Sequence, residues 1–307
     1  MSSEVNQTKF GSTPLVSVLM NCFNGEQYLQ EAIDSVVAQT YSNWEIIFWD
    51  NQSTDRSASV VASYQDPRIK YYYAPTHTML YEARNHAYMQ AKGELIAFLD
   101  VDDSWESEKL QNQVPLFLDP KVGLSCCNYW VVNELKGKRS LAIKKFLRRK
   151  KKVVDALLRY YDIGLLTLVV RRSALSTEHP PFDRRFHIIG DFDMVIRLAT
   201  TWDVAYSQQP LASYRLHGGN ESIKRKELMV LELETWVSEQ RNNIALVNAC
   251  NQNSLAVYLN YSKACQAILE CDRAEAFSYA ISLPWCYLKA KALIGIVLPN
   301  WLAQIIF

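Results

Sequence analysis

Residues 95–103 read LIAFLDVDD, an apolar run that ends in three aspartates within four positions. Leu95–Leu99 has the length and composition of a buried strand, and Asp100–Asp103 begins where it stops. Closely spaced carboxylates repel one another unless a cation neutralises them, and oxygen ligands suit Mg²⁺ or Mn²⁺. The stretch therefore predicts a divalent-metal site at a strand end, with an acidic turn before a helix as the alternative.

Two earlier apolar runs end in the same way. LVSVLM at residues 15–20 leads into Asn21–Asn24, and WEIIFW at residues 44–49 leads into Asp50–Asp55. The carboxyl ends of parallel strands meet at one edge of a sheet, and ligands bind at that edge in open α/β folds. The sequence therefore predicts one pocket that these two clusters share with Asp100–Asp103.

Helical patterns separate these strands. Apolar residues recur at helical spacing over residues 28–39 and 81–91, a further helix runs to about Tyr64, and a strand fits residues 69–73. Alternation of strand and helix at this pace predicts an α/β fold. Its sheet is expected to be Rossmann-like and mostly parallel, with helices on both faces.

The rest of the chain is less regular and then becomes helical. Up to residue 222 the pattern predicts strands at 123–132 and 165–170, a helix at 193–200 and a polar loop at 214–222. Helices are then expected at 227–250, 254–269, 273–283 and 285–298, with alanines spaced for close packing. We therefore expect a disordered lead-in over residues 1–13, an α/β domain over 14–225 and a helical subdomain over 226–307.

Charge and cysteine content argue against several classes of protein. Lys and Arg number 33 against 32 Asp and Glu, a net charge of +1, whereas nucleic-acid binders usually carry a strong basic excess. Seven cysteines without Cys-x-x-Cys spacing favour reduced thiols over a zinc site or a disulfide framework. The polar start, residues 1–13, lacks the apolar core of a signal peptide, so a cytoplasmic location is expected.

Two segments raise the hypothesis of peripheral contact with the inner face of a membrane. Lys144–Lys152 carries seven basic residues in nine, and 292–307 is a largely apolar stretch that Pro299 and Asn300 interrupt. A solvated face for the first segment, and packing on the domain or on a second copy for the other, are the alternatives. The sequence leaves the oligomeric state open.

Five segments resemble the family 2 glycosyltransferases, in the order in which that family has them. They are PLVSVLMNCFNGEQYLQEAIDSVVAQTY, WEIIFWDNQSTDRS, EARNHAYMQAKGELIAFLDVDD, FDRRFHIIGDFDMVIRLA and YRLHGGNES, and they span about residues 14–222. The resemblance implies a GT-A fold and inverting transfer of a sugar from a nucleotide-diphosphate sugar to an acceptor hydroxyl. A glycan or lipid-linked acceptor, in surface polysaccharide or glycolipid synthesis, is then expected.

The resemblance also implies which residues bind the donor. They are Asn21, Phe23, Asn24, Asp50, Arg84, Asn85, Asp102 and Arg215. Phe23 occupies the place of an aromatic ring that stacks on the base, and Asp50 that of a carboxylate that accepts a base N–H. Arg84 is expected to offset the diphosphate charge, as is Arg215 from a loop that closes over the diphosphate. A core aromatic, a turn aspartate and surface arginines are the plain alternatives.

For the metal and the catalytic base, the resemblance points to four residues. Asp103 is the first choice as a ligand of Mg²⁺ or Mn²⁺, Asp102 contacts the ribose or the metal, and His217 the metal or a phosphate. Asp191 stands at the position of the base. Many members have Glu-Asp where this chain has Gly190 before Asp191, so one acid is missing.

Other functions fit the residues less well. A sugar nucleotidyltransferase would carry a Gly-rich, basic loop after its first strand, and a dehydrogenase Gly-x-Gly-x-x-Gly, but this chain has Asn21–Gly25 there. A non-catalytic protein that binds a nucleotide sugar or scaffolds an assembly stays open because of Gly190. The presence of all three acids, Asp102, Asp103 and Asp191, together with His217, favours the enzyme.

Overall fold

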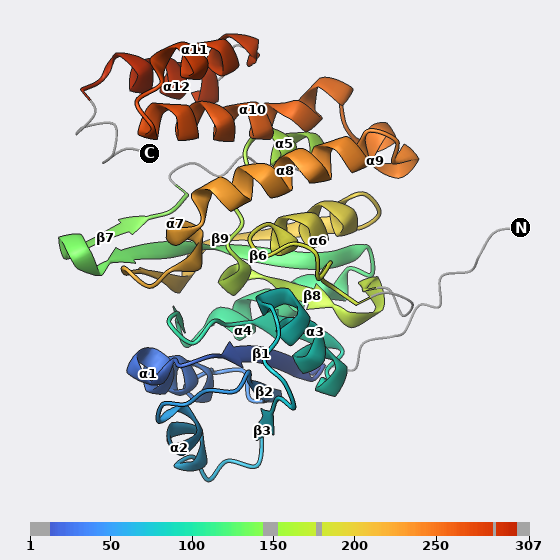
Figure 1. Cartoon of the computed structure of the whole chain (residues 1–307). Helices are drawn as coiled ribbons and strands as arrows, with labels where there is room; N and C mark the ends of the chain where they lie inside the picture. Colours follow the sequence, from blue (N-terminus) through green and yellow to red (C-terminus); the bar gives the residue numbers. More distant parts are fainter. Residues whose placement is uncertain (1–12, 144–152, 176–179, 285–286, 300–307) are drawn as a thin grey trace, which may run out of the picture. The chain divides into compact units, whose positions relative to one another are not determined.

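The computed structural model describes residues 13–143, 153–175, 180–284 and 287–299, and this part of the chain forms two compact units (Figure 1). The first unit takes its described residues from 1–147, 163–190 and 201–218. The second takes them from 148–162, 191–200 and 219–307. Two internal segments, around residues 153–162 and 191–200, thus belong with the C-terminal helices.

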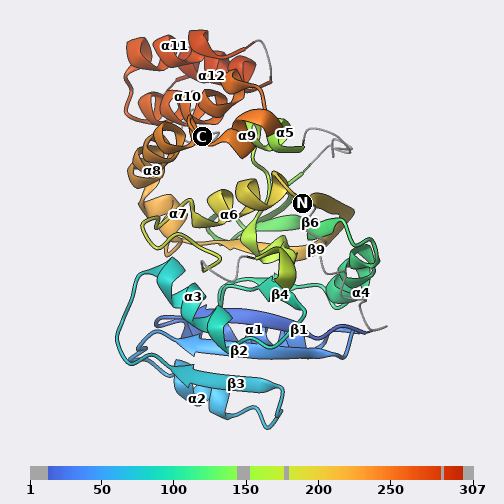
Figure 2. The same ribbon diagram turned by 90° about the vertical axis from the view of Figure 1, so that its right-hand side faces the viewer.

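One mixed sheet is the framework of the first unit. Its strands, within the described residues, are β1 (Val16–Cys22), β2 (Trp44–Asp50), β3 (Ile69–Tyr73), β4 (Leu95–Phe98), β5 (Ser104–Trp105), β6 (Val122–Asn133), β7 (Lys138–Leu141), β8 (Val169–Arg171) and β9 (Asp203–Leu216). Their order is β3-β2-β1-β4-β8-β6-β9-β5, with β7 paired to β6. Figures 1 and 2 show β1, β2 and β3 side by side, as this pairing requires.

The parallel half of the sheet fixes where a ligand can bind. β1 pairs in parallel with both β2 and β4, and β2 pairs in parallel with β3. The connecting helices are α1 (Glu26–Val37), α2 (Ser57–Ala62) and α3 (Leu80–Gln90). Because such crossovers are right-handed, α1 and α2 cover one face and α3, on the return to β4, covers the other. The strand order therefore reverses between β1 and β4, whose carboxyl ends border a crevice for ligands.

The second half of the sheet departs from the mostly parallel prediction. β8 is antiparallel to β4 and β6, β5 is antiparallel to β9, and only β6 and β9 pair in parallel. The predicted α/β class with helices on both faces is confirmed, but the sheet is mixed. The reason is that the chain after β4 returns through antiparallel neighbours instead of further strand–helix units.

Three local predictions need correction. Residues 203–216 form the long strand β9, so Tyr214–Leu216 are strand rather than polar loop. Residues 165–167 form a 3₁₀ turn before β8, where a strand was expected. The expected helix 227–250 is two helices, α8 (Lys226–Gln240) and α9 (Ile244–Ala249). Polar residues in β9 and the short break after α8 hide these boundaries from sequence periodicity.

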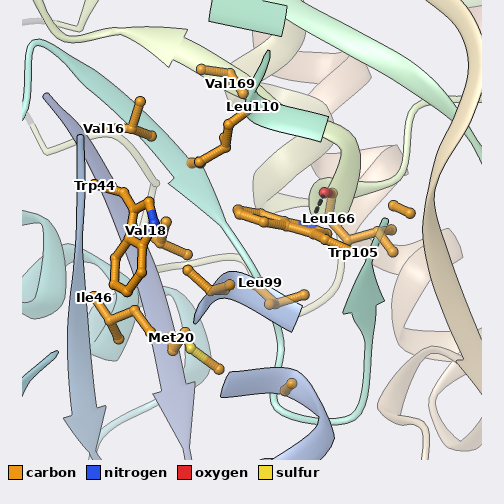
Figure 3. Packing of buried hydrophobic residues seen from close by; sticks show 14 of the residues in the cluster. Val16, Val18, Met20, Trp44, Ile46, Leu99, Trp105, Leu110, Leu166 and Val169 are labelled. Carbon is orange, nitrogen blue, oxygen red and sulfur yellow. Dashed lines mark hydrogen bonds between the residues drawn. The ribbon is translucent and has the colours of Figure 1, made fainter. Parts of the chain in front are cut away.

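The core of the first unit lies between the sheet and its helices. β2 is buried along its whole length, as expected for a central parallel strand covered on both faces. Trp105 is 6% exposed, and its Nε1 donates a hydrogen bond to the Leu166 carbonyl at 2.9 Å (Figure 3). This bond gives the indole N–H its partner, so the ring can be buried without an unpaired polar group.

The second unit is helical in its described part. Its helices are α5 (Val153–Arg159), α6 (Gly190–Ala199), α7 (Glu221–Lys224), α8, α9, α10 (Gln252–Leu269), α11 (Arg273–Ser282) and α12 (Tyr287–Val297). Ala264, Ala280 and Ala292 are fully buried together, one from each of the last three helices. The predicted close packing through alanines is confirmed for these three helices.

The structure describes only part of the two segments on which the membrane hypothesis rests. Among the described helices, none combines the length and apolarity needed to cross a bilayer. The basic segment Lys144–Lys152 and the last eight residues, 300–307, lie outside the described residues. The six described cysteines carry thiols, and Cys22, Cys126 and Cys127 are buried.

A lysine is buried in the first unit, and no carboxylate of the described residues forms an ion pair with it. Lys109, the first residue of α4 (Lys109–Gln113), is 0% exposed, and its Nζ has no hydrogen-bond partner among the described residues. The ammonium lies 4.1 Å from the centroid of the Trp105 ring, with the thiols of Cys126 and Cys127 nearby. Burial lowers the pKa of Lys109 to about 8, because the charged form loses its water shell.

We predict that Lys109→Met makes the protein more stable at pH 7, by roughly 1–3 kcal/mol. Between pH 8 and the ordinary lysine pKa of 10.5, the unfolded wild type binds more protons than the folded one, so its stability rises with pH. Burial raises the pKa of Cys127 to about 11, which opposes this rise above pH 9, so pH 7 to 9 is the informative range. Urea unfolding at pH 7, 8 and 9 measures both effects.

The matched control is Lys138→Met, at an exposed position on β7. This variant should keep the wild-type rise in stability, whereas Lys109→Met should lose it. Equal slopes of stability against pH in the wild type and Lys109→Met would contradict the buried charge.

Candidate active site

The loops after β1 and β2 are joined by hydrogen bonds at the carboxyl edge of the sheet. Asn24, which has a left-handed φ of 55°, accepts a bond from the Thr54 N–H at 2.8 Å through Oδ1. Its own N–H donates to Ser53 Oγ at 3.0 Å. Asn24 was predicted to contact the donor, and in the structure its side chain holds the two loops together.

An exposed pair of rings lies on the same edge. Phe23 is 54% exposed, and its ring centroid lies 4.4 Å from that of His77. His77 is held through Nδ1, which lies 2.9 Å from the Asn51 carbonyl oxygen. The Asn51 side chain also bonds to both backbone groups of Thr78. This Phe23–His77 platform is therefore held in place on its histidine side, and its Phe23 side chain is about half exposed.

Sequence reasoning missed His77. Its signal was its position, because the segment after β3 (Ile69–Tyr73) also leaves a parallel strand at its carboxyl end. The loops after β1, β2 and β3 all lie at the carboxyl edge of the sheet, where a ligand can bind.

Asp50 and Asn21 lie deeper at this edge. Asp50 is fully buried, and its carboxylate accepts bonds from the Ser53 N–H and the Tyr71 hydroxyl, both at 2.7 Å. The Asn21 amide nitrogen, Nδ2, is buried and has no hydrogen-bond partner among the described residues. A buried, unpaired N–H₂ group at a ligand edge costs free energy unless a ligand accepts its bond.

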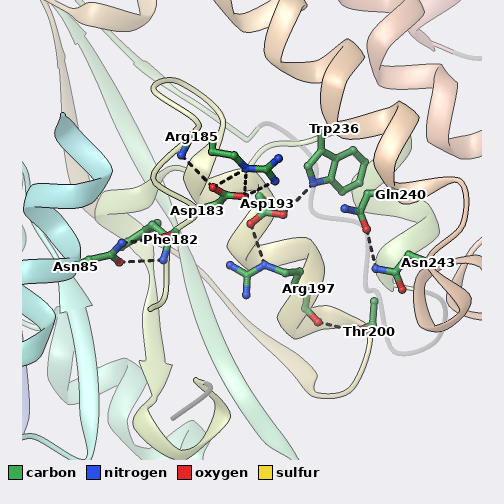
Figure 4. Close-up of polar contacts among 10 residues, drawn as sticks. All are labelled: Asn85, Phe182, Asp183, Arg185, Asp193, Arg197, Thr200, Trp236, Gln240 and Asn243. Atoms are coloured by element: carbon green, nitrogen blue, oxygen red, sulfur yellow. Dashed lines mark hydrogen bonds and ion pairs between the residues drawn. The ribbon is translucent and has the colours of Figure 1, made fainter. Parts of the chain in front are cut away.

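The two residues predicted on α3 have different partners. Arg84 is buried, and its Nη2 donates to Asp100 Oδ1 at 2.5 Å. Asn85 exchanges two hydrogen bonds with the backbone of Phe182, at 2.8 and 3.0 Å (Figure 4). Arg84 therefore brings positive charge to the acidic motif, while Asn85 anchors the segment around Phe182.

Asp102 and His217, two residues of types that bind metals, lie side by side at this edge. His217 Nε2 lies 3.0 Å from Asp102 Oδ2, although the two residues are far apart in the sequence. Burial and the nearby charge of Asp100 raise the pKa of Asp102, and the bond to His217 partly opposes this. The segment that follows β9 thus brings His217 to the DVDD motif.

Asp103 has an inward position. It is 3% exposed, and its Oδ1 accepts a hydrogen bond from the Arg215 backbone N–H at 2.9 Å. Burial, Asp102 and Asp100 together raise the pKa of Asp103 well above its ordinary value. Asp103 was the first choice as a metal ligand, and here it fixes the end of β9 to the turn after β4.

The Arg215 guanidinium is surrounded by protein partners. Its Nε donates to the Asp102 carbonyl at 2.9 Å, Nη1 to Glu134 at 2.6 Å and Nη2 to Glu31 at 2.5 Å. The group also lies 4.5 Å from the centroid of the Tyr28 ring. Arg215 was predicted to pair with a phosphate. In the structure it bonds to protein groups and so holds α1 and the β6–β7 hairpin against the acidic motif.

The donor set can be tested for a divalent cation. In the described residues, no group of three or more His, Cys, Asp and Glu side chains has the arrangement of a complete site. Asp100 raises the pKa of Asp102, and both of these carboxylates raise the pKa of Asp103, as expected for acids awaiting a counter-charge. An Asp and a His that leave positions for diphosphate oxygens fit Mg²⁺ or Mn²⁺.

The predicted base belongs to the second unit. Asp191 is half-buried in the first turn of α6, and its charge adds to burial in raising the pKa of Tyr258 to about 12. Asp193 is 4% exposed and accepts bonds from Trp236 Nε1 at 2.9 Å and Arg197 Nε at 2.8 Å (Figure 4). Asp193 therefore supports the packing of α6 against α8.

The missing acid at position 190 has a steric explanation. A Cβ atom on Gly190 would lie 2.6 Å from the ring of Tyr81, closer than such atoms approach in proteins. The Tyr81 ring is fixed by its hydroxyl, which donates to the Ile188 carbonyl at 3.0 Å. Tyr81 thus fills the space that a side chain at position 190 would need.

Comparison with known proteins agrees with this geometry. The model of glycosyl transferase family 2 matches residues 17–175, more than half of the chain. The UDP-Glc:alpha-D-GlcNAc-diphosphoundecaprenol beta-1,3-glucosyltransferase WfgD of Escherichia coli is 34% identical over 55% of this chain and 64% of its own length. The putative teichuronic acid biosynthesis glycosyltransferase TuaG of Bacillus subtilis is 29% identical over 73% of this chain and 86% of its own.

The fold has a counterpart among solved structures. The S. aureus TarS 1-349 complex with UDP-GlcNAc superposes with a TM-score of 0.67, at 18% identity, over 88% of this chain and 81% of that one. This likeness confirms the predicted GT-A-like fold with its helical C-terminal region. The family match over residues 17–175 shows that the chain belongs to glycosyl transferase family 2.

Proposed function

We propose that this protein transfers a sugar from a nucleoside-diphosphate sugar to an acceptor hydroxyl with inversion at the anomeric carbon. The observation that carries the proposal is the Asp102–His217 pair at the carboxyl edge of the sheet, where the strand order reverses. An acid and an imidazole at this edge suit a diphosphate with its cation.

The base of the donor binds on the Phe23–His77 platform. Phe23 offers an open ring face, and the buried Asn21 amide gains an acceptor when a ligand enters this edge. Asp50 retains lone pairs beside its two bonds and serves as an acceptor for a base N–H. A uridine diphosphate donor is proposed, because the name of the E. coli relative gives UDP-Glc for that protein.

Asp102 and His217 would hold Mg²⁺ or Mn²⁺, which when bound supplies Lewis-acid stabilisation of the leaving diphosphate. Asp103 and Arg215 keep this pair in place through the bond between the turn after β4 and the end of β9. Arg84, next to Asp100, limits the repulsion between the acidic motif and the diphosphate.

Asp191 is proposed as the base that takes the proton of the acceptor hydroxyl during the attack on the anomeric carbon. A single displacement from the side opposite the leaving group inverts the configuration. We propose a lipid-linked saccharide at the inner membrane face as the acceptor, because the E. coli relative is named for a diphosphoundecaprenol substrate. Tyr81 accounts for the small residue at position 190, and activity measurements decide between the enzyme and the non-catalytic alternative.

We predict that Phe23→Ala weakens UDP binding in the presence of Mn²⁺ by roughly 5- to 100-fold, because a stacked base loses its platform. Isothermal titration calorimetry measures the affinity, and folding is not at risk because the ring is 54% exposed. Phe277→Ala, at an exposed phenylalanine on α11, is the matched control and should bind UDP like the wild type. Equal affinities in all three proteins would remove the base site from the proposal.

We predict that Asp191→Asn lowers sugar transfer from UDP-glucose to a GlcNAc-diphospholipid acceptor by roughly 10²- to 10⁴-fold, the usual contribution of a base. UDP affinity should not change, because the substitution removes the proton acceptor and leaves the donor edge intact. Asp203→Asn, at an exposed position at the start of β9, is the control. Wild-type rates in Asp191→Asn would exclude the assigned base, and a wild type without turnover of any donor it binds would favour the non-catalytic alternative.

A further inference from the structure

A second polar pocket lies in the first unit, on the face of the sheet next to α1. Its volume is about 250 Å³, and it is lined by Glu31, Ser104, Val132, Arg139, Ser213 and Arg215. The strand register explains the set. Val132 is the direct neighbour of Arg139 on β7 and of Arg215 on β9, while Ser213 faces Ser104 on β5. Direct neighbours and alternate residues share one face of a sheet, so these five side chains form the floor, with Glu31 at the wall.

The charges around this pocket are already balanced. Arg215 is paired with Glu31 and Glu134, and Arg139 donates to Glu106 at 3.0 Å. Arg139 also lies 4.4 Å from the centroid of the Trp130 ring. A phosphate in the pocket would meet the carboxylate of Glu31 as well as the two guanidinium groups.

Hydroxyl groups match this lining better than an anion does. A sugar hydroxyl both donates and accepts hydrogen bonds, so it can use a carboxylate, a guanidinium and a serine at the same time. The pocket is smaller than the 300–1,000 Å³ or so typical of drug-sized ligands, which suits a single sugar ring.

The pocket is joined directly to the acidic motif. Ser104 follows Asp103 in the chain, and Arg215 bonds to Asp103 through its backbone and to the Asp102 carbonyl through its side chain. A ligand that rests on Arg215 and Ser104 is thus one residue away from the motif that we assign to the diphosphate. We propose that this pocket is a saccharide subsite, in which Glu31, Arg139 and the two serines hold a neutral sugar ring of the acceptor. The proposal rests on the proposed function.

The test uses the full chain with UDP and Mn²⁺. Saturation-transfer difference NMR measures binding of four probes, the methyl glycosides of glucose, galactose, mannose and N-acetylglucosamine. We expect at least one probe to bind, and Arg139→Leu and Glu31→Gln each to weaken it 5-fold or more. Arg68→Leu is the matched control, since Arg68 also lies over a tryptophan, Trp44, and pairs with a carboxylate, Asp66, but does not line the pocket. Its probe affinity should equal that of the wild type.

Three results would overturn the inference. They are no binding of any of the four probes to the wild type, binding that both pocket variants leave unchanged, and displacement of the bound probe by inorganic phosphate. UDP titration of the same samples separates this inference from the proposed function. If UDP binds and the pocket variants have no effect, only the saccharide subsite fails, whereas absence of UDP binding in folded wild type counts against the donor site itself.

Discussion

The hydrogen bond from the Arg215 backbone to the buried Asp103 carboxylate is the contact on which the arrangement of the candidate site depends. It joins the end of β9 to the turn after β4, and it brings His217 to Asp102. A carboxylate as deeply buried as Asp103 would be costly without such a donor. The Arg215 guanidinium is held in turn by Glu31, Glu134 and Tyr28. The positions of α1 and the β6–β7 hairpin are therefore also tied to Arg215.

The carboxylates of the acidic motif repel one another, and neighbouring side chains offset part of this repulsion. Burial and the charges of neighbouring aspartates raise the pKa of Asp102 and Asp103, while Arg84 donates to Asp100 and His217 lies against Asp102. A site built in this way favours a cationic ligand before the anionic donor arrives. The neighbouring pocket has the opposite character, because each arginine that lines it already has a carboxylate partner. The diphosphate and the neutral sugar would thus bind to different surfaces, the acidic motif and the neighbouring pocket. Arg215 contacts both of them.

Several predicted site residues act through the backbone. Asn24 holds two loops together and Asn85 anchors the Phe182 segment, so both shape the site. Gly190 also shapes the site. Its missing side chain leaves room for the Tyr81 ring. From the sequence alone, these residues could only be assigned by their place in a motif, because their partners are far away along the chain.

The sequence by itself determined the strands β1 to β4, the helices between them and the polar clusters at their ends, because periodicity and composition act over short distances. It also determined the identity of the acidic motif and the helical character of the chain after residue 226. Only the tertiary structure decided the long strand β9, the platform of Phe23 with His77 and the partners of Arg215. Those features arise from pairings between residues about 50 to almost 200 positions apart, and no local pattern of side chains records such contacts.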